Sequence, residues 1–151
     1  MTAPLAYFLT WTTYGNWLPG DERGWITRPA TGIMPASRPL SDDCRARLGH
    51  APIILSNHER ETVHDTIVDH CTIRGWTAHA VNVRTNHVHV VVSAKPDPDT
   101  VAKQFKAWCS RRLNALRNPP PRHWWTRGES TPYINSEAEL ADVMDYVLNR
   151  Q

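Results

Sequence analysis

Residues 86–92 read Asn-His-Val-His-Val-Val-Val, and this stretch limits the possible folds of the chain more than any other. Its β-branched side chains favour a buried strand. Because side chains alternate across a strand, His87 and His89 share one face. The other face carries Val88, Val90 and Val92. Two imidazoles at this spacing can bind one metal ion; the alternative is a pair of half-exposed strand histidines, a common position for this residue.

The length and charge of the chain bear on the number of domains and on the kind of partner it can bind. A chain of 151 residues suits a single domain, expected over residues 1–151. A formal charge of +2 and a pI near 8.6 permit a nucleic-acid partner without requiring one. Seven tryptophans are more than such a core needs, so we expect several at the surface, where they can stack on bases.

The cysteines and the apolar runs exclude other classes. Cys44, Cys71 and Cys109 contain no CxxC pair, so the sequence predicts neither a disulfide framework nor a cysteine zinc site, and a cytoplasmic setting is expected. No apolar run approaches the roughly 20 residues that cross a membrane. The N-terminus has no signal-peptide pattern, and we expect no membrane partner.

The strands and helices are expected in a recognisable order. Strands are predicted at residues 5–13, 76–83, 86–92 and 123–128, the last continued by 131–134. Helices are predicted from a capping box at Ser56 and Glu59 to Gly75, over residues 100–116, and from a second box at Ser136 and Glu139. A long irregular loop is expected at about residues 14–55.

This order is that of the ferredoxin-like split βαβ plan in the α+β class. It predicts a four-stranded antiparallel sheet with two helices on one face. The valines of residues 86–92 would meet those helices, and the two histidines would face away from them. The C-terminal helix is the candidate to cover the histidine face, and it carries Tyr146 on the flank of its apolar stripe. That stripe is Leu140, Val143, Met144 and Val147.

The helix at residues 100–116 has a basic face. Lys103 and Lys106 lie opposite its apolar arc, with Arg111 at the edge. Such a face is usually only solvated, but it also suits contact with phosphates. A metal held by two histidines, a tyrosine that can attack phosphorus and a basic face together indicate DNA strand transfer.

These residues resemble the single-tyrosine HUH transposases (IS200-like), most closely the REP-associated tyrosine transposase branch. The similarity covers Thr12 to Gln151 and rests on residues 85–92 with the runs 12–25, 105–108, 125–128 and 145–148. The resemblance implies a bacterial nuclease, nucleoid-associated when bound to DNA, that cuts single-stranded DNA near hairpins. It also implies Mg²⁺ or Mn²⁺ as the cofactor, a 5′-phosphotyrosine intermediate and a free 3′-hydroxyl.

The family's site carries over residue by residue. His87 and His89 match the metal pair, and Tyr146 matches the nucleophile, with Tyr133 in reserve. The family's third ligand is commonly a glutamine about one turn after the tyrosine. Here Arg150 stands four residues on and Gln151 five, roughly 140° around an ideal helix, so Gln151 is an open candidate. Candidate DNA contacts are Lys103, Lys106, Arg111, Arg23, Arg127, Trp17 and Trp125.

Two other functions remain open from the sequence. A domesticated descendant would bind DNA hairpins through the basic face and the tryptophans without cutting them. A metal-dependent hydrolase of small phosphoesters is a weaker interpretation, because such a substrate gives no reason for a basic helix face. The sequence does not decide between a homodimer and a monomer.

Overall fold

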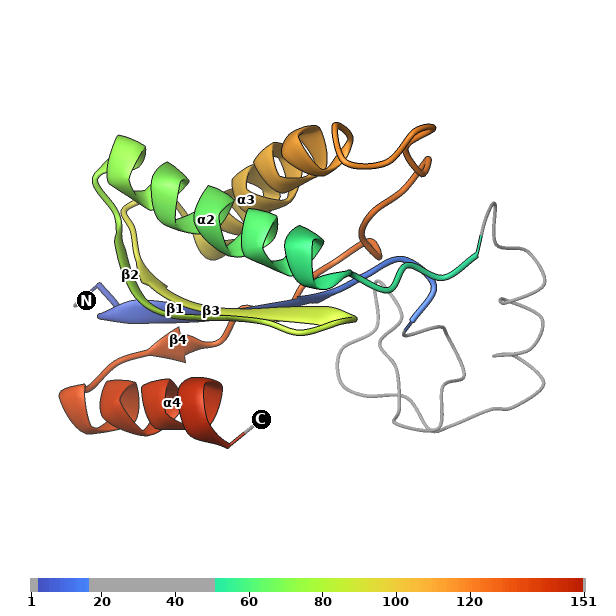
Figure 1. Cartoon of the computed structure of the whole chain (residues 1–151). Helices are drawn as coiled ribbons and strands as arrows, with labels where there is room; N and C mark the ends of the chain where they lie inside the picture. Colours follow the sequence, from blue (N-terminus) through green and yellow to red (C-terminus); the bar gives the residue numbers. More distant parts are fainter. Residues whose placement is uncertain (1–2, 17–50, 151) are drawn as a thin grey trace.

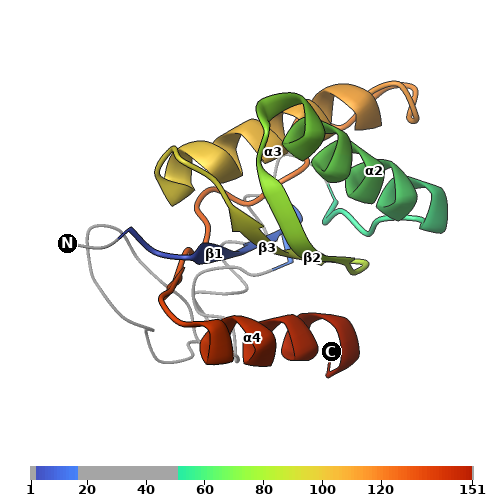
Figure 2. The ribbon, with the colours of Figure 1, turned by 90° about the vertical axis from the view of Figure 1, so that its left-hand side faces the viewer.

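The computed structural model describes residues 3–16 and 51–150 of the chain. In this part, four strands form one antiparallel sheet in the order β2-β3-β1-β4. Helices α2 and α3 cover one face of the sheet, and α4 lies against the other (Figures 1 and 2). The elements are β1 (Ala6–Thr12), α2 (Asn57–Arg74), β2 (Thr77–Val83), β3 (His87–Ser93), α3 (Pro98–Leu113), β4 (Tyr133–Ile134) and α4 (Glu137–Asn149). The predicted α+β plan, with a C-terminal helix on the far face, is confirmed.

The larger core lies between the sheet and the α2–α3 layer. From β3 it receives Val88, Val90 and Val92, all fully buried, as the alternation predicted. Phe105 of α3 stacks on Trp11 of β1 with ring centroids 6.2 Å apart. Burying one such side chain contributes roughly 1.5–3 kcal/mol. This layer therefore buries more apolar side chains than the α4 side of the sheet.

Two cysteines belong to the same core. Cys71 of α2 and Cys109 of α3 are both buried and unbridged. Burial raises the pKa of the Cys71 thiol to about 11, and burial also raises the pKa of the Cys109 thiol. Because both thiols stay neutral and covered, neither is placed to act as a nucleophile.

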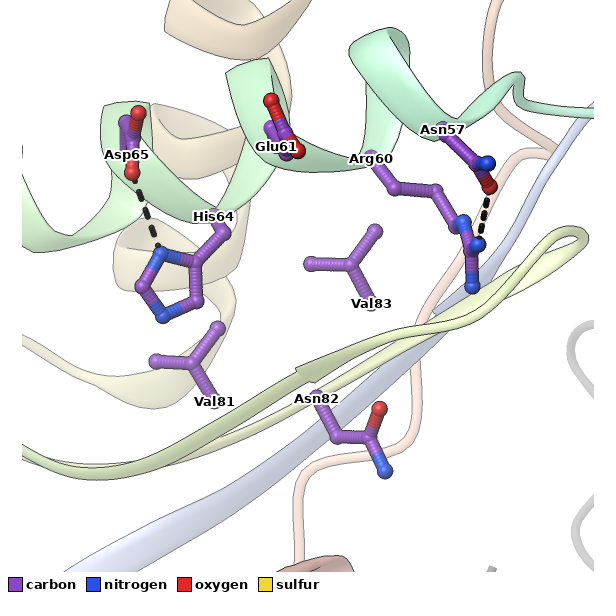
Figure 3. Close-up of a pocket in the computed structure, with 8 residues that line it drawn as sticks. All are labelled: Asn57, Arg60, Glu61, His64, Asp65, Val81, Asn82 and Val83. Carbon is purple, nitrogen blue, oxygen red and sulfur yellow. Dashed lines mark hydrogen bonds and ion pairs between the residues drawn. The ribbon is translucent and has the colours of Figure 1, made fainter.

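A smaller core lies between the sheet and α4. Val147 is fully buried there against Val91 and Ile134, while the rest of the predicted stripe is partly buried. Asn82 of β2 donates a hydrogen bond from Nδ2 to the Val147 carbonyl at 2.7 Å. Figure 3 shows Asn82 pointing away from α2, whereas Val81 points towards it. One polar contact and a thin apolar layer therefore hold α4 on the sheet.

Helix α2 begins and ends as the sequence predicts. The Ser56 hydroxyl accepts from the Glu59 N–H at 3.1 Å, and the Glu59 carboxylate accepts from the Ser56 N–H at 2.9 Å. Gly75 ends the helix with φ 73°, in the left-handed region that suits glycine. None of the helices in the described part of the chain is long and apolar enough to span a membrane.

Helix α3 starts earlier than predicted, whereas α4 starts after Ser136 as predicted but with one different hydrogen bond. Helix α3 begins at Pro98, after an N-cap at Asp97, and not at Thr100. Proline was expected to end the preceding strand, but it also suits the first position of a helix. At α4, the Ser136 hydroxyl accepts from the Glu139 N–H at 3.1 Å. The Glu139 carboxylate accepts from the Asn135 N–H at 3.5 Å and not from Ser136, so that box is only half formed.

The fourth strand also differs from prediction. Only Tyr133–Ile134 form a strand beside β1, and residues 123–128 make no strand. An isolated bridge joins Thr13 to Trp125. The indole N–H of Trp124 donates to Asn114 Oδ1 at 2.7 Å, and that of Trp125 donates to the Lys106 carbonyl at 3.1 Å. The aromatic run was wrongly predicted as a strand because its side chains anchor an irregular segment to α3.

An ion pair with a buried carboxylate joins the start of α2 to the segment after α3. The buried Glu59 carboxylate accepts from Arg117 Nε at 2.6 Å and from its Nη2 at 2.8 Å. Burial by itself would raise the pKa of Glu59, but the hydrogen bonds and charge of Arg117, together with the bonds from Ser56, bring that pKa below its ordinary value. Glu59 is therefore ionised in the folded protein.

We expect Arg117→Ala to lower the free energy of unfolding by about 3 kcal/mol, because it leaves the Glu59 carboxylate buried without its partner. The stabilisation from the lowered pKa is fully present above the unfolded carboxyl pKa of about 4.3 and is lost as the pH falls through the folded pKa. The difference between wild type and variant should therefore shrink in acid. Urea unfolding of both proteins at neutral and acidic pH measures this difference in the free energy of unfolding.

The matched control is Arg112→Ala. Arg112 pairs with Asp69 at 3.0 Å, but both side chains are about half exposed, and exposed pairs contribute roughly 0–1 kcal/mol. An equal loss in the two variants, or a difference independent of pH, would contradict the role given to Glu59.

Candidate active site

The two strand histidines lie on the α4 face of the sheet. Their ring centroids are 4.7 Å apart and the ring planes are nearly perpendicular, at 80°. His89 is only 7% exposed and His87 is half-buried. β3 places them there because it gives its alternate valines to the larger core. The structure thus brings the predicted pair together on the predicted face.

Each histidine has a hydrogen-bonded Nδ1 atom. His87 Nδ1 lies 2.8 Å from Oδ1 of Asn86, the residue before it. His89 Nδ1 lies 3.0 Å from the Thr10 hydroxyl, on the strand that pairs with β3. Such partners orient an imidazole, and in a metal site of this kind Nε2 is the nitrogen that would bind the ion. Neither partner was assigned a role from the sequence; Thr10 reaches His89 because the two residues lie opposite each other where β1 pairs with β3.

Tyr146 of α4 is the nearest phenol to this pair. Its ring centroid lies 6.3 Å from that of His89 and 6.3 Å from that of Phe8. Phe8 itself lies 5.6 Å from His89, so the three rings pack together between the sheet and α4. Tyr146 is nevertheless 42% exposed, which agrees with its predicted place off the apolar stripe. The role of Phe8 was missed because it depends on the pairing of β1 with β3.

Arg150 lies on the same side of α4 as Tyr146. Its guanidinium carbon is 6.0 Å from the centroid of the Tyr146 ring, and its Nε atom pairs with Asp145 at 3.1 Å. Arg150 therefore places a cation beside the Tyr146 ring, in a pair with Asp145. Gln151, the candidate third ligand, lies outside the described residues.

The donor set fits a divalent ion in part. Two imidazoles supply nitrogen ligands, and of Mg²⁺ and Mn²⁺ the transition ion binds imidazole more readily. Among the described residues, no group of three or more His, Cys, Asp or Glu side chains is placed to hold a metal. The pair therefore accounts for two ligand positions and leaves the others open for oxygen atoms.

Tyr133, the reserve nucleophile, is on the opposite face of the sheet. It pairs in register with Tyr7 of β1, and the two ring centroids are 5.5 Å apart. Tyr7 belongs to the larger core, on the side of α2 and α3. Tyr133 is 53% exposed but is separated from the histidines by the sheet.

Three of the candidate DNA contacts, Lys103, Lys106 and Arg111, lie on α3. Lys103 and Arg111 are exposed, and the Arg111 guanidinium lies 4.6 Å from the centroid of the Trp108 ring. Lys106 differs, because its amine binds the Gly128 carbonyl at 2.8 Å and pairs with Glu129 at 3.2 Å, with 14% of its side chain exposed. Lys106 therefore holds the loop at Gly128 and Glu129 against α3. Its predicted contact with phosphate would require these bonds to break.

The segment around Arg127 lies nearer the histidines. The Thr126 N–H donates to the Thr12 carbonyl at 3.0 Å, and Thr12 pairs with His87. Arg127 is exposed, whereas Trp125 is half-buried. Trp17 and Arg23 lie outside the described residues. Of the candidate contacts, Arg127 and Trp125 alone are placed by the described part of the chain at the histidine end of the sheet.

The hollow between α2 and β2 is separate from this site. It has a volume of about 570 Å³ and is lined by polar side chains such as Glu61, His64 and Asp65 (Figure 3). These belong to α2, on the other side of the sheet from α4. Neither the histidine pair nor Tyr146 lines it.

Comparisons with known proteins bear on the whole chain. The family described as "Transposase IS200 like" matches residues 52–150. No curated protein sequence is significantly similar. The crystal structure of a proposed transposase from Deinococcus radiodurans R1 is 18% identical, with a TM-score of 0.54 and coverage of 100% of this chain and 94% of that one.

A second similar structure is that of a REP-associated tyrosine transposase bound to a REP hairpin. It is 10% identical, with a TM-score of 0.57, and the match covers 97% of this chain and 67% of that one. At these identities the two structures show that the fold is shared.

Proposed function

The chain belongs to the IS200-like transposase family, and on that premise we propose that it is a metal-dependent strand transferase that cuts single-stranded DNA beside a hairpin. The observation that carries the proposal is the position of Tyr146, whose ring lies 6.3 Å from His89 across the boundary between α4 and the sheet. The hairpin substrate is suggested by the similar transposase bound to a REP hairpin, which also suggests the REP-associated branch.

In the proposed reaction, the Tyr146 hydroxyl attacks a DNA phosphorus atom in line with the 3′ oxygen. The bond from the tyrosine oxygen to phosphorus forms as the bond from phosphorus to the 3′ oxygen breaks. The phenol proton passes to solvent, and the leaving oxygen takes up a proton to become a free 3′-hydroxyl. The 5′-phosphate of the downstream DNA stays on the protein.

Each residue of the proposed site has its own role in this reaction. His87 and His89 would hold a divalent ion, and the chemistry this ion supplies when bound is Lewis-acid polarisation of the phosphodiester. Phe8 and His89 orient the tyrosine ring by packing against it. Arg150, whose guanidinium carbon lies 6.0 Å from the centroid of the Tyr146 ring, would stabilise negative charge that develops there during attack.

Covalent capture of DNA tests this function. The protein is incubated with Mn²⁺ and a library of hairpin oligonucleotides with randomised single-stranded flanks, and the products are run on a denaturing gel. A label at the 3′ end should appear in a protein–DNA adduct, because the downstream fragment stays attached. A label at the 5′ end should appear in a shortened oligonucleotide with a free 3′-hydroxyl.

A second candidate function is hairpin binding without cutting. Two observations favour it. Arg150 stands where the family commonly has a glutamine ligand. Within the described residues, only the two histidines are placed as metal ligands, and no group of three or more is found. Tight binding of a hairpin without any adduct would support this domesticated form.

Both functions need DNA contact, which we expect from the exposed cations of α3. Lys103→Ala and Arg111→Ala should each weaken hairpin binding and lower the slope of log affinity against log salt by about 0.7–0.9 per lost phosphate contact. Fluorescence anisotropy over a range of salt concentrations measures this slope. Arg74→Ala, at the end of α2, removes the same charge from another exposed position and is the control. Slopes equal to that of the control would mean that this face is only solvated.

A further inference from the structure

Asn86 occupies a fixed position beside the first histidine. Its backbone carbonyl accepts from the Thr13 N–H at 2.9 Å and from the Thr13 hydroxyl at 3.2 Å. Thr13 is fully buried, and its hydroxyl also donates to the Ile53 carbonyl at 2.8 Å. The turn between β2 and β3 is therefore tied to the end of β1. This anchoring holds the Asn86 side chain against His87.

The contact between these two side chains has one possible direction. The amide Oδ1 of Asn86 is only an acceptor, so the bond to His87 Nδ1 at 2.8 Å requires the proton on that nitrogen. In the neutral ring the lone pair is then on Nε2. In free histidine the other tautomer, with the proton on Nε2, is favoured. With Oδ1 of Asn86 facing the ring, this contact favours the tautomer that is less populated in free histidine.

The second histidine shows the contrast. His89 Nδ1 lies 3.0 Å from the Thr10 hydroxyl, which can donate or accept. The backbone of Thr10 is fixed by two hydrogen bonds with Ser130, at 2.8 and 2.9 Å. Thr10 therefore orients the His89 ring but does not determine which nitrogen carries the proton.

We propose that Asn86 is a positioning residue that holds the Nδ1 proton of His87 and so prepares its Nε2 atom to bind a divalent ion. This inference rests on the proposed function for its purpose, but the protonation state is a property of the metal-free protein. Outer partners of this kind typically change metal affinity 10- to 100-fold when they are removed.

The first measurement is nitrogen NMR of the metal-free protein with labelled histidine, above the reference imidazole pKa of about 6.5. Wild-type His87 should carry its proton on Nδ1. Asn86→Ala should move much of the population to the Nε2-protonated form, while Asn86→Asp keeps an acceptor and should keep the Nδ1 proton. Thr85→Ala, at an exposed position in the same turn, should leave the ring unchanged.

The second measurement is Mn²⁺ affinity by calorimetry on the same proteins. Asn86→Ala should bind at least about tenfold more weakly than wild type, whereas Asn86→Asp and Thr85→Ala should bind as tightly as wild type. The carbonyl that anchors the turn is present in every variant, so the fold should persist.

Wild-type His87 protonated on Nε2, undiminished Mn²⁺ affinity in Asn86→Ala, or no Mn²⁺ binding by wild type would each overturn the inference. Failure of the proposed function alone gives another pattern. The ring protonation and Mn²⁺ affinities would follow the inference, but no covalent DNA adduct would form.

Discussion

Tyr146→Phe is expected to abolish the covalent protein–DNA adduct completely, with no loss of folding or of hairpin affinity. The phenol oxygen is the proposed nucleophile, and phenylalanine has no group that can replace it. The ring contacts with Phe8 and His89 remain, because they involve the aromatic carbons. A denaturing gel with 3′-labelled hairpin DNA and Mn²⁺ measures the adduct, and anisotropy measures binding.

Tyr133→Phe is the matched control for this experiment. It removes the same hydroxyl from an equally exposed tyrosine on the other face of the sheet. This variant should form the adduct at the wild-type rate. An adduct that persists in Tyr146→Phe and disappears in Tyr133→Phe would identify Tyr133 of β4 as the nucleophile. Helix α4 would then have to lie elsewhere in the DNA complex.

The second large effect is expected at the histidine pair. His87→Ala and His89→Ala should each remove DNA cleavage, because one imidazole cannot hold the ion in the geometry that two provide. His87 is half-buried, so its removal should leave stability close to wild type. His89 is 7% exposed and packs against Phe8, so its removal should cost some stability without disturbing the valines of the larger core.

Cleavage, Mn²⁺ affinity and urea unfolding should be measured on the same preparations. His64→Ala is the control, since His64 is an exposed histidine of α2 on the other side of the sheet. Cleavage by either site variant at the wild-type rate would contradict the assignment of the pair as ligands. Loss of cleavage together with loss of folding in His87→Ala would also contradict it.

Much of the fold could be predicted because its signals are local. The capping box at Ser56 and Glu59, the stop at Gly75 and the alternation in residues 86–92 each act within a few residues. The same alternation placed the histidines on the face opposite the two-helix layer. The apolar stripe of the last helix then indicated what would cover them.

The features that the sequence did not predict depend on contacts between segments that are distant in the chain. A helical wheel puts Lys106 on the outer face of α3, but the segment at Gly128 and Glu129 returns to bind its amine. The aromatic residues 123–125 suggest a strand, yet Trp124 is buried by contact with α3. The partner of His89 depends on register, because Thr10 lies opposite it only when β1 pairs with β3.

The sheet separates the residues that keep the domain folded from those proposed to carry its chemistry. β3 serves both, with Val88, Val90 and Val92 on the side of the larger core and the two histidines on the other. In evolutionary terms, this arrangement lets selection act on the two faces independently. Under the proposed function, a lineage could lose cleavage through one substitution at His87 and still inherit a folded domain with the exposed cations of α3 in place. The path from a mobile element's enzyme to a resident hairpin-binding protein is then a single mutational step.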